Sequence, residues 1–401
     1  MTLANNYLTI VNYRVTDNVN FFGSDLSSIL MPRALLNAGT LWSWGSNSIG
    51  QLGSLGATTA SRSSPGTTSG GGVNWKQISA GGYADKFAGG VKTNGTLWMW
   101  GSNVDGELGI GTTLSRSSPT TTSGGGTNWS QISCGYAHTA AVKTDGTAWC
   151  WGDNSFGSVG DGTTLSRSSP VKITGTNWYR VSSGKLLTLG LKTDGSLWYW
   201  GYNGFGQGGD GTASSESVPT AVIGSFTWTD MAACNYFSIG LRSDGTLWSW
   251  GQNTNGNLGD GTTVNRSSPV SVLGGFTWKA INEGGGDTQS VLAIRTDGTL
   301  WSWGSNGNGQ LGTGDGTNRS SPVTVIGGGT NWVSCTCGVH NFFAIKADGT
   351  LWACGYNISG ALGNNDSGDT SSPISVVGGI NTWKQVAAGY ATSYGVTDIS
   401  F

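Results

Sequence analysis

The feature that most constrains the fold is a segment that recurs seven times along the 401-residue chain. Its first copy, GTLWSWG, begins at Gly39, and successive copies follow after 49 to 56 residues, counted between their first tryptophans. These tryptophans are Trp42, Trp98, Trp149, Trp198, Trp248, Trp301 and Trp352. A second motif, such as NWKQI, keeps the same period at Trp75, Trp129, Trp178, Trp228, Trp278, Trp332 and Trp383. Repetition of this kind indicates units that pack on their neighbours.

One repeat contains four short segments with the alternation that is typical of β-strands. In the third copy they lie at residues 129–133, 138–143, 147–151 and 170–173. Asp145-Gly146 between the second and third segments predicts a two-residue hairpin turn, since glycine tolerates positive φ. Four antiparallel strands about every 50 residues, repeated seven times, predict an all-β, seven-bladed β-propeller.

The two ends of the chain carry complementary half-repeats. The copy at Gly39 has a third and a fourth strand but no preceding NWKQI motif. The last copy has a first strand from Trp383 and a second strand at 393–397, but no LWSWG motif after them. We therefore expect one blade to be closed by the N- and C-terminal halves, in a propeller that spans residues 39–401.

Residues 1–38 lie outside the repeats and are predicted to form an N-terminal arm. The segment YLTIVNYRV and the pair Phe21-Phe22 place large apolar side chains in this arm. We expect the arm to dock on a larger assembly, with docking on its own propeller as the alternative. The predicted anchor residues are Tyr7, Ile10, Tyr13, Phe21 and Phe22.

The repeats resemble those of the regulator of chromosome condensation family. The resemblance rests on the run from Cys134 to Thr139, followed by Asp145-Gly146 and Trp151-Gly152, and on the recurring GQLG. It covers roughly residues 39–397 and implies a seven-bladed propeller with a protein-interaction role. It does not fix the partner, because one fold hosts many functions.

Known branches of this family differ in their fit to the chain. The nucleotide-exchange branch implies a basic tail and a long wedge-like insertion, and neither is found in this sequence. The ultraviolet-B photoreceptor branch implies clustered tryptophans among arginines, whereas all twenty tryptophans here belong to the two repeated motifs and are expected to pack in the core. A β-lactamase-inhibitor branch is compatible with the residues. The near-identical, charge-poor copies are similar to repeats in bacterial and phage genomes.

Composition excludes several classes of partner. Charged residues make up 10% of the chain and the net charge is −2, so no basic surface favours nucleic acid or an anionic membrane. No apolar run reaches the length of a membrane-spanning helix, and no classical signal peptide is recognised. We expect a virion, cell-surface or extracellular location, with the cytoplasm as the alternative.

Few residues are suited to catalysis or metal binding. The chain has two histidines, and His138 stands at a repeated position that favours a structural hydrogen bond. Cys335 and Cys337 with His340 have the residue types of a zinc site, but both cysteines replace small apolar residues of the repeat. The GDGT segments lack the ligand spacing of calcium loops and are interpreted as turns. We expect no enzyme activity, cofactor or metal.

Differences between the copies collect at one end of the blades. In an antiparallel blade, the connections between strands one and two and between strands three and four share one face, named here the loop face. The opposite turn face carries the nearly uniform TDG turns. On the loop face, each copy keeps an Asn and then varies, and aromatic residues stand at several loop tips. The predicted partner-binding residues are Ser48, Ile49, Val104, Asp105, Phe156, Phe205, Tyr236, Phe237, His340 and Phe342.

Two functions from different classes remain at this point. The leading hypothesis is a phage or viral particle component that displays the propeller for protein or glycan binding and is anchored by residues 1–38. The alternative is a soluble propeller that regulates an enzyme or a small GTPase. Neutral loop variation remains an alternative explanation for the loop face.

Overall fold

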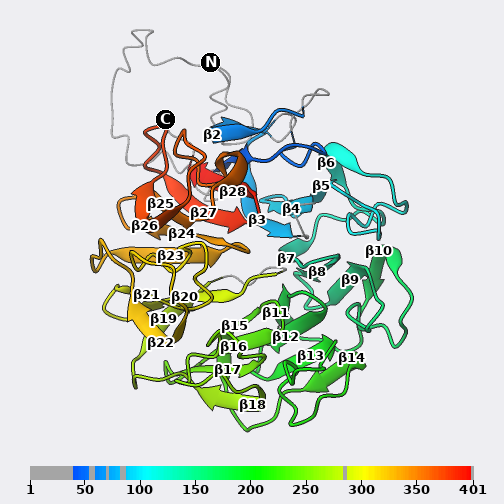
Figure 1. Ribbon diagram of the computed structural model, residues 1–401. Coiled ribbons are helices and arrows are strands. Elements are labelled where there is room, and N and C mark those ends of the chain that lie inside the picture. The colour runs from blue at the N-terminus through cyan, green and yellow to red at the C-terminus, as the bar shows by residue number, and fades with distance from the viewer. Residues whose placement is uncertain (1–38, 54–58, 69–71, 82–86, 283–286, 399–401) are drawn as a thin grey trace, which may run out of the picture.

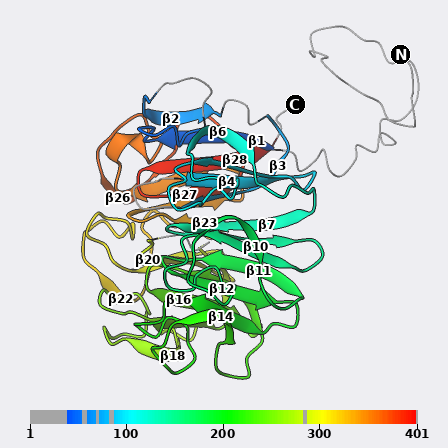
Figure 2. The same cartoon turned by 90° about the vertical axis from the view of Figure 1, so that its right-hand side faces the viewer.

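The computed structural model describes residues 39–53, 59–68, 72–81, 87–282 and 287–398. These residues form a ring of β-sheets around a central axis (Figure 1). Seen from the side, the strands run between the two faces of the ring (Figure 2). The predicted anchor residues of the N-terminal arm lie outside the described residues.

Six blades are continuous in sequence, and each has four antiparallel strands. Their bounds are β3 (Trp75–Gly81), β4 (Phe87–Lys92), β5 (Leu97–Gly101) and β6 (Arg116–Thr121); β7 (Trp129–Cys134), β8 (His138–Lys143), β9 (Ala148–Gly152) and β10 (Arg167–Lys172); β11 (Trp178–Ser183), β12 (Leu187–Lys192), β13 (Leu197–Gly201) and β14 (Glu216–Ala221); β15 (Trp228–Ala233), β16 (Phe237–Arg242), β17 (Leu247–Gly251) and β18 (Arg266–Ser271); β19 (Trp278–Ile281), β20 (Ser290–Arg295), β21 (Leu300–Gly304) and β22 (Arg319–Thr324); and β23 (Trp332–Cys337), β24 (Asn341–Lys346), β25 (Leu351–Gly355) and β26 (Thr370–Ser375). One 3-10 turn, η2 (Ile358–Gly360), lies in the last of these blades.

The seventh blade joins the two ends of the described chain. It contains β1 (Gly39–Gly45), β2 (Arg62–Thr67), β27 (Trp383–Ala388) and β28 (Thr392–Asp398). β1 pairs with β28 in unbroken antiparallel register from Gly39 opposite Asp398 to Gly45 opposite Thr392. The predicted composite blade and the seven-bladed ring are therefore confirmed.

The hairpin turns differ in one detail from the prediction. Gly146 N donates to the Lys143 carbonyl and Lys143 N donates to the Thr147 carbonyl, so the connection has three residues rather than two. A type I turn followed by a residue at positive φ suits a three-residue loop, and Gly146 has φ +75°. The fourth strand also begins three residues earlier than predicted, at Arg167.

Thirteen of the twenty tryptophans are buried in the core, as expected, whereas the first tryptophan of each GTLWSWG-type copy, such as Trp198, is half-buried and packs against the edge of that core. First-strand tryptophans such as Trp178 are buried, and so is the second tryptophan of each LWxWG motif. The indole of that second tryptophan often reaches the preceding blade: Trp151 Nε1 donates to the Glu107 carbonyl at 2.7 Å, and Trp250 Nε1 to the Gln207 carbonyl at 2.8 Å. Both motifs thus stabilise the ring, because each buried indole covers a large apolar area.

Candidate binding face

The two kinds of loop meet on one face of the ring, as the antiparallel topology requires. Tyr202 N, just after β13, donates to the Leu186 carbonyl in the loop between β11 and β12 at 2.8 Å. The same bond joins Tyr356 N to the His340 carbonyl in a later blade. The turns lie at the other ends of the strands, where Trp178 N donates to the Gly146 carbonyl of the preceding blade.

The repeated Asn of the loop face holds its loop in place. The Asn103 side-chain oxygen accepts a hydrogen bond from Leu108 N at 2.8 Å. Its amide nitrogen donates to the carbonyls of Thr112 and Leu114. The two residues after the Asn project from this loop into solvent. Ser48, Ile49, Val104, Asp105 and Phe156 are exposed.

The remaining predicted face residues are less exposed. Phe205, Tyr236 and His340 are half-buried at the surface of the loop face. Phe237 and Phe342 are buried, so the prediction that they stand on this face is wrong. Each lies in the second strand of its blade, where the side chain packs into the core against a neighbouring blade. Phe237 joins the cluster that contains Trp303 of the next blade, and Phe342 joins the cluster that contains Leu292 of the preceding blade.

Four rings gather on the loop face into what we call the aromatic patch, formed by Phe156, Tyr202, Phe205 and Tyr236. They come from three neighbouring blades, through the β9–β10, β13–β14 and β15–β16 loops. Tyr202 stands at the centre, with its ring centroid 5.0 Å from that of Phe156 and 5.9 Å from that of Tyr236. Phe205 and Tyr236 are 5.1 Å apart. The phenyl ring of Phe156 is 43% exposed and gives the patch an open edge.

An ion pair spans the loop face beside this patch. Lys185 Nζ lies 3.0 Å from Asp287 Oδ1, across the intervening blade. The ammonium group also lies 4.8 Å from the centre of the Tyr236 ring and 5.2 Å from that of Tyr136. Burial lowers the pKa of Lys185, but the contact with Asp287 outweighs it, and the net pKa is raised. Lys185 is therefore charged at neutral pH. Its contacts with Tyr136, Tyr236 and Asp287 connect the loops of four successive blades.

A second group of rings lies further round the same face. His340, Tyr356 and Tyr390 contact one another edge to face, with centroids 5.5 to 6.2 Å apart. Burial lowers the pKa of His340, with the nearby charge of Asp287 acting in the opposite direction. His340 is therefore neutral at neutral pH.

Several members of these groups are not among the residues predicted from the sequence. The predicted set rests on the pair after the repeated Asn, whereas Tyr202 and Tyr356 stand directly after LWxWG. That position is also variable: its occupants are Ser46, Ser102, Asp153, Tyr202, Gln252, Ser305 and Tyr356. Comparison of the copies at this position would have found both tyrosines.

The polar core shows no catalytic arrangement in the described residues. His138 is fully buried, and its Nε2 lies 2.9 Å from the Thr188 hydroxyl. Burial lowers the pKa of His138 to about 4, so the ring is neutral and enclosed. Burial raises the pKa of the Cys134 and Cys337 thiols to about 12. Across the described ranges, no three His, Cys, Asp or Glu side chains meet in a way that could hold a metal ion.

The GDGT segments form turns that are held by internal hydrogen bonds. Asp161 Oδ1 accepts hydrogen bonds from the backbone and the hydroxyl of Thr163, and Asp161 Oδ2 pairs with Arg167 at 2.6 Å. Asp260 makes the same pair with Arg266. These carboxylates are therefore engaged in holding the loop against β10 and β18.

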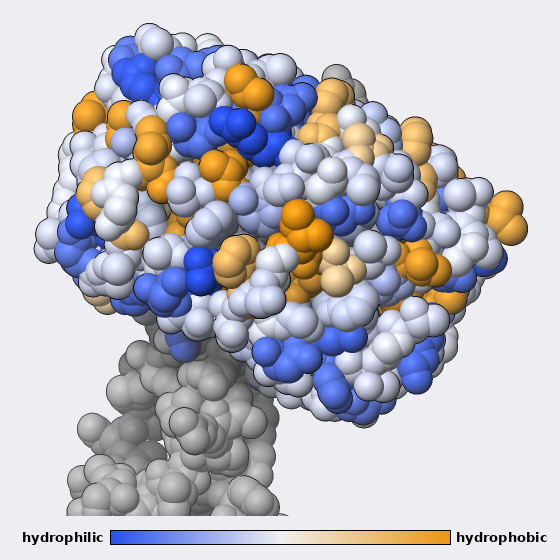
Figure 3. Space-filling view, turned by 90° about the horizontal axis from the view of Figure 1, so that it is seen from below, coloured by the Kyte–Doolittle hydropathy of each residue, from blue (hydrophilic) through white to orange (hydrophobic). Residues whose placement is uncertain are grey.

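Other surfaces carry less concentrated apolar groups. On the rim seen from below, apolar side chains are scattered among hydrophilic ones (Figure 3). Isolated exposed apolar residues are normal for soluble proteins, whereas gathered aromatic groups mark binding surfaces. In the described part of the chain there is also no helix with the length and apolar character needed to cross a bilayer.

Comparison with known proteins identifies the repeat family. The model of the RCC1-like domain matches residues 31–335, and that of the regulator of chromosome condensation (RCC1) repeat matches residues 348–396. The ultraviolet-B receptor UVR8 of Arabidopsis thaliana is 34% identical over 141 residues, which cover 35% of this chain and 31% of the receptor. The match thus spans less than a third of that relative.

Solved structures agree on the fold. Human WBSCR16 superimposes with a TM-score of 0.78 at 20% identity, covering 90% of this chain and 99% of that protein. Prp20p from Saccharomyces cerevisiae, described together with its binding to Gsp1p and histones, has a TM-score of 0.76 at 19% identity, covering 91% and 93%. At these identities the likeness shows a shared propeller fold.

Proposed function

Because the chain belongs to the RCC1-like domain family, we propose that it is a non-enzymatic interaction propeller that binds a partner protein through its loop face. The observation that carries the proposal is the aromatic patch. It joins rings from three blades at the place where the repeats differ most. A rigid ring of this kind presents loops without needing to change shape.

The chemistry of the aromatic patch supports a protein ligand. Aromatic residues are enriched among the residues that dominate binding energy at protein interfaces, where they fill apolar pockets of the partner. The Lys185–Asp287 pair supplies polar groups beside the rings, as the polar rim of an interface requires. The description of Prp20p with protein partners also favours this class of ligand.

The other expectations stay predictions. The matches reported above are to plant, human and yeast proteins, and they lend no support to a phage or viral particle component. Glycan binding, an assembly role for residues 1–38, and a virion or extracellular location likewise stay untested. The soluble binding module is therefore the better-supported of the two hypotheses.

The proposal is tested by capture of proteins from an extract of the source cell. The test variant carries F156A, F205A and Y236A, and the matched control carries I223A, L273A and I326A. The three control side chains are 41–46% exposed, close to the 43% of Phe156, but follow the fourth strands, away from the aromatic patch. Thermal unfolding of each protein shows whether the ring is intact.

We expect the wild type and the control to retain the same partner, and the patch variant to lose it while unfolding at nearly the same temperature. An aromatic residue that acts as a binding hot spot costs about 2 kcal/mol or more when it is truncated, so a single hot spot among the three gives at least about a thirtyfold loss of affinity. An unchanged partner on a folded patch variant would overturn the proposal.

A further inference from the structure

The first residue of the fourth strand distinguishes the blade at the centre of the aromatic patch. Six copies begin this strand with an arginine or a threonine, at Arg62, Arg116, Arg167, Arg266, Arg319 and Thr370. In three of these copies the arginine pairs with an aspartate of the preceding loop, as Arg167 does with Asp161. In the blade that carries Tyr202 and Phe205, the same position is Glu216. A carboxylate thus replaces the cation in the loop at the centre of the patch.

In this loop the aspartate is held without an arginine. The Tyr199 phenol donates to Asp210 Oδ2 at 2.7 Å, and Asn203 Nδ2 donates to Asp210 Oδ1 at 3.1 Å. The ring of Tyr199 has room because Gly208 stands where the other copies have Leu or Val, and a Cβ on Gly208 would overlap that ring. The phenol therefore does the work of the missing arginine, and the loop does not depend on Glu216.

Glu216 lies between the two loops that carry Phe156 and Tyr202. It pairs in the β13–β14 ladder with Gly201, the residue before Tyr202. Gly157, directly after Phe156, packs on its backbone, since a Cβ on Gly157 would lie 2.9 Å from the Glu216 carbonyl oxygen. Glu216 is half-buried and has no ion-pair partner among the residues that the structure describes. An unpaired carboxylate thus stands where the two loops meet.

The cations around the patch are already engaged. Lys185 is neutralised by its ion pair across the loop face. Arg167 and Arg266, which begin the fourth strands of the two flanking blades, each pair with an aspartate of their own loop. Asp153, three residues before Phe156, adds a second carboxylate on this face. Because interfaces bring opposite charges together, the negative charge beside the rings favours a basic partner.

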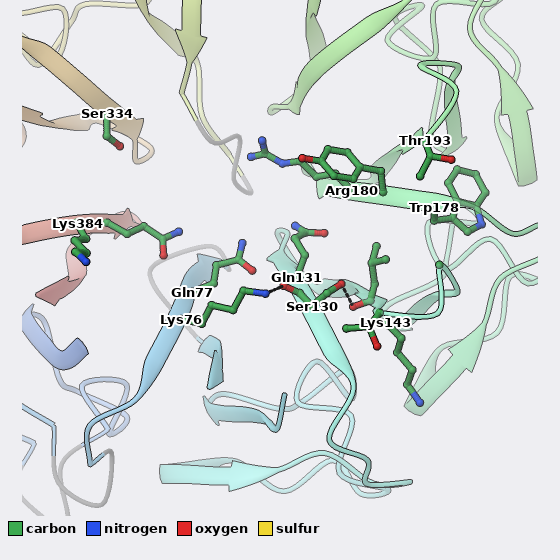
Figure 4. A pocket seen from close by; sticks show the side chains of 15 residues that line it. Lys76, Gln77, Ser130, Gln131, Lys143, Trp178, Arg180, Thr193, Ser334 and Lys384 are labelled. Carbon is green, nitrogen blue, oxygen red and sulfur yellow. Dashed lines mark hydrogen bonds between the residues drawn. The ribbon is translucent and has the colours of Figure 1, made fainter. Parts of the chain in front are cut away.

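The three blades that carry the patch are also tied together at their first strands. Gln131 and Arg180 project from the neighbouring strands β7 and β11 (Figure 4). Gln131 Oε1 accepts a hydrogen bond from Val181 N, and Gln131 Nε2 donates to the Val181 carbonyl, both at 3.0 Å. Arg180 forms an ion pair with Asp230 of β15. The loops of these blades therefore keep a fixed relation, and little ordering of the protein is needed when a ligand binds.

We propose that the aromatic patch binds a basic protein segment, which presents a lysine or arginine to Glu216 and places its apolar atoms on the rings. This inference rests on the proposed function and specifies the chemistry of the partner. The faces of aromatic rings such as Phe156 and Tyr202 attract cations. The Glu216 carboxylate adds a charge-assisted hydrogen bond, which is stronger than a neutral one.

The test is selection of displayed random peptides on the immobilised full chain at about 150 mM salt, followed by titration of the selected peptides against purified variants. E216R restores the arginine of the other copies, and E216Q removes the charge at nearly constant shape. The control is D194R, which makes the same change of charge in the β12–β13 turn of the same blade, on the turn face. The variant F156A/F205A/Y236A shows whether a peptide binds at the patch.

We expect the selected peptides to carry lysine or arginine beside an aromatic or aliphatic residue. Their Kd should rise about tenfold or more in E216R, less in E216Q, and less than about twofold in D194R. Replacing the basic residues of a peptide by glutamine should weaken its binding to the wild type and have little further effect in E216Q.

Neutral or acidic peptides that are lost in the patch variant would overturn the basic partner and leave the proposed function intact. Selection of no peptide above an uncoated surface, or basic peptides that bind E216R as well as D194R, would also overturn this inference. Failure of the proposed function itself would appear in the extract experiment, as a captured protein that the patch variant still retains.

Discussion

The loop face and the turn face of the ring are built from the same seven repeats but differ in how far the repeats agree. On the turn face, an Asp or Asn accepts hydrogen bonds from the residue two positions on, as Asp145 does from Thr147, and a Gly at positive φ follows. On the loop face, the Asn that organises the loop and the glycines three and six residues after it are kept, and the two residues directly after the Asn vary. Residues repeat where the backbone conformation requires them, and they vary where side chains project into solvent.

The largest loss of folding stability should come from a substitution on the turn face. Gly298 has φ +80°, and a Cβ there would lie 2.0 Å from the Thr330 carbonyl oxygen. We expect G298A to lower the free energy of unfolding by about 3–4 kcal/mol, because both the backbone strain and the clash must be relieved by movement of the chain. Chemical denaturation measures this difference.

Gly275 provides the matched control for G298A. Its φ is +60°, but a Cβ there would have no neighbour within 4 Å. G275A should therefore cost only about 1 kcal/mol, the strain of the left-handed conformation alone. Equal losses for the two variants would show that the turns are not held by close approach of the backbone.

The two ends of β8 should respond to acid at different pH values. His138, at the end near the loop face, has its pKa lowered by burial from 6.5 to about 4. The unfolded chain therefore binds a proton in this interval that the folded chain does not, and stability falls as the pH drops from about 6.5 to about 4. At about pH 4 this proton lowers the free energy of unfolding by about 3 kcal/mol.

The control for this prediction is H138L, since Leu187 fills the corresponding position at the start of β12. Denaturation between pH 7 and pH 4.5 should show a smaller loss of stability in H138L than in the wild type. At the turn-face end of β8, hydrogen bonds from Thr147 lower the pKa of Asp145. The stability that the ionised Asp145 contributes is therefore lost only in stronger acid. Identical pH profiles of the two proteins would contradict the burial of a neutral His138.

A smaller loss of folding stability is expected when the ion pair of the loop face is broken. K185M leaves the buried Asp287 carboxylate without its cation and should cost about 1–2 kcal/mol. K185M/D287N removes the buried charge as well and should recover part of that loss. Denaturation of the two single variants and the double variant measures the coupling. Additive losses would show that the two side chains do not interact in solution.

The smallest effect is expected for N94D. Asn94 is the single Asn among the second-to-third-strand turns, where five other copies have Asp. It already accepts hydrogen bonds from the backbone and hydroxyl of Thr96, so the variant should change the free energy of unfolding by no more than about 0.5 kcal/mol. A larger change would show that the turns of the copies are not equivalent.

Much of the ring could be predicted from the sequence because the same Trp and Gly motifs recur in every repeat. The blade number, the composite blade and the core role of tryptophan follow from counting Trp and Gly positions. The burial of individual residues at the loops could not be predicted by such counting. Tyr236 is half-buried at the surface, whereas the next residue, Phe237, is in the core. A one-residue step at a strand end reverses the side-chain direction, and no periodicity fixes that step in a short loop.

The assembly of the aromatic patch was also beyond the sequence. Tyr202 meets Phe156 and Tyr236 only because neighbouring blades bring their loops together, and these contacts join residues far apart in the chain. The Lys185–Asp287 pair crosses a whole intervening blade. Such juxtapositions depend on the twist and the angle between blades, which composition and spacing do not specify.

Site-specific photo-crosslinking to the captured partner tests most directly the claim that one face binds and the other maintains the ring. A photoreactive phenylalanine analogue is placed at Phe156 or Phe205 on the loop face, and at Asn94 or Asp348 on the turn face. We expect crosslinks to the partner from Phe156 and Phe205 and none from the two turn positions. Crosslinks from Asn94 or Asp348, with none from the loop face, would contradict it.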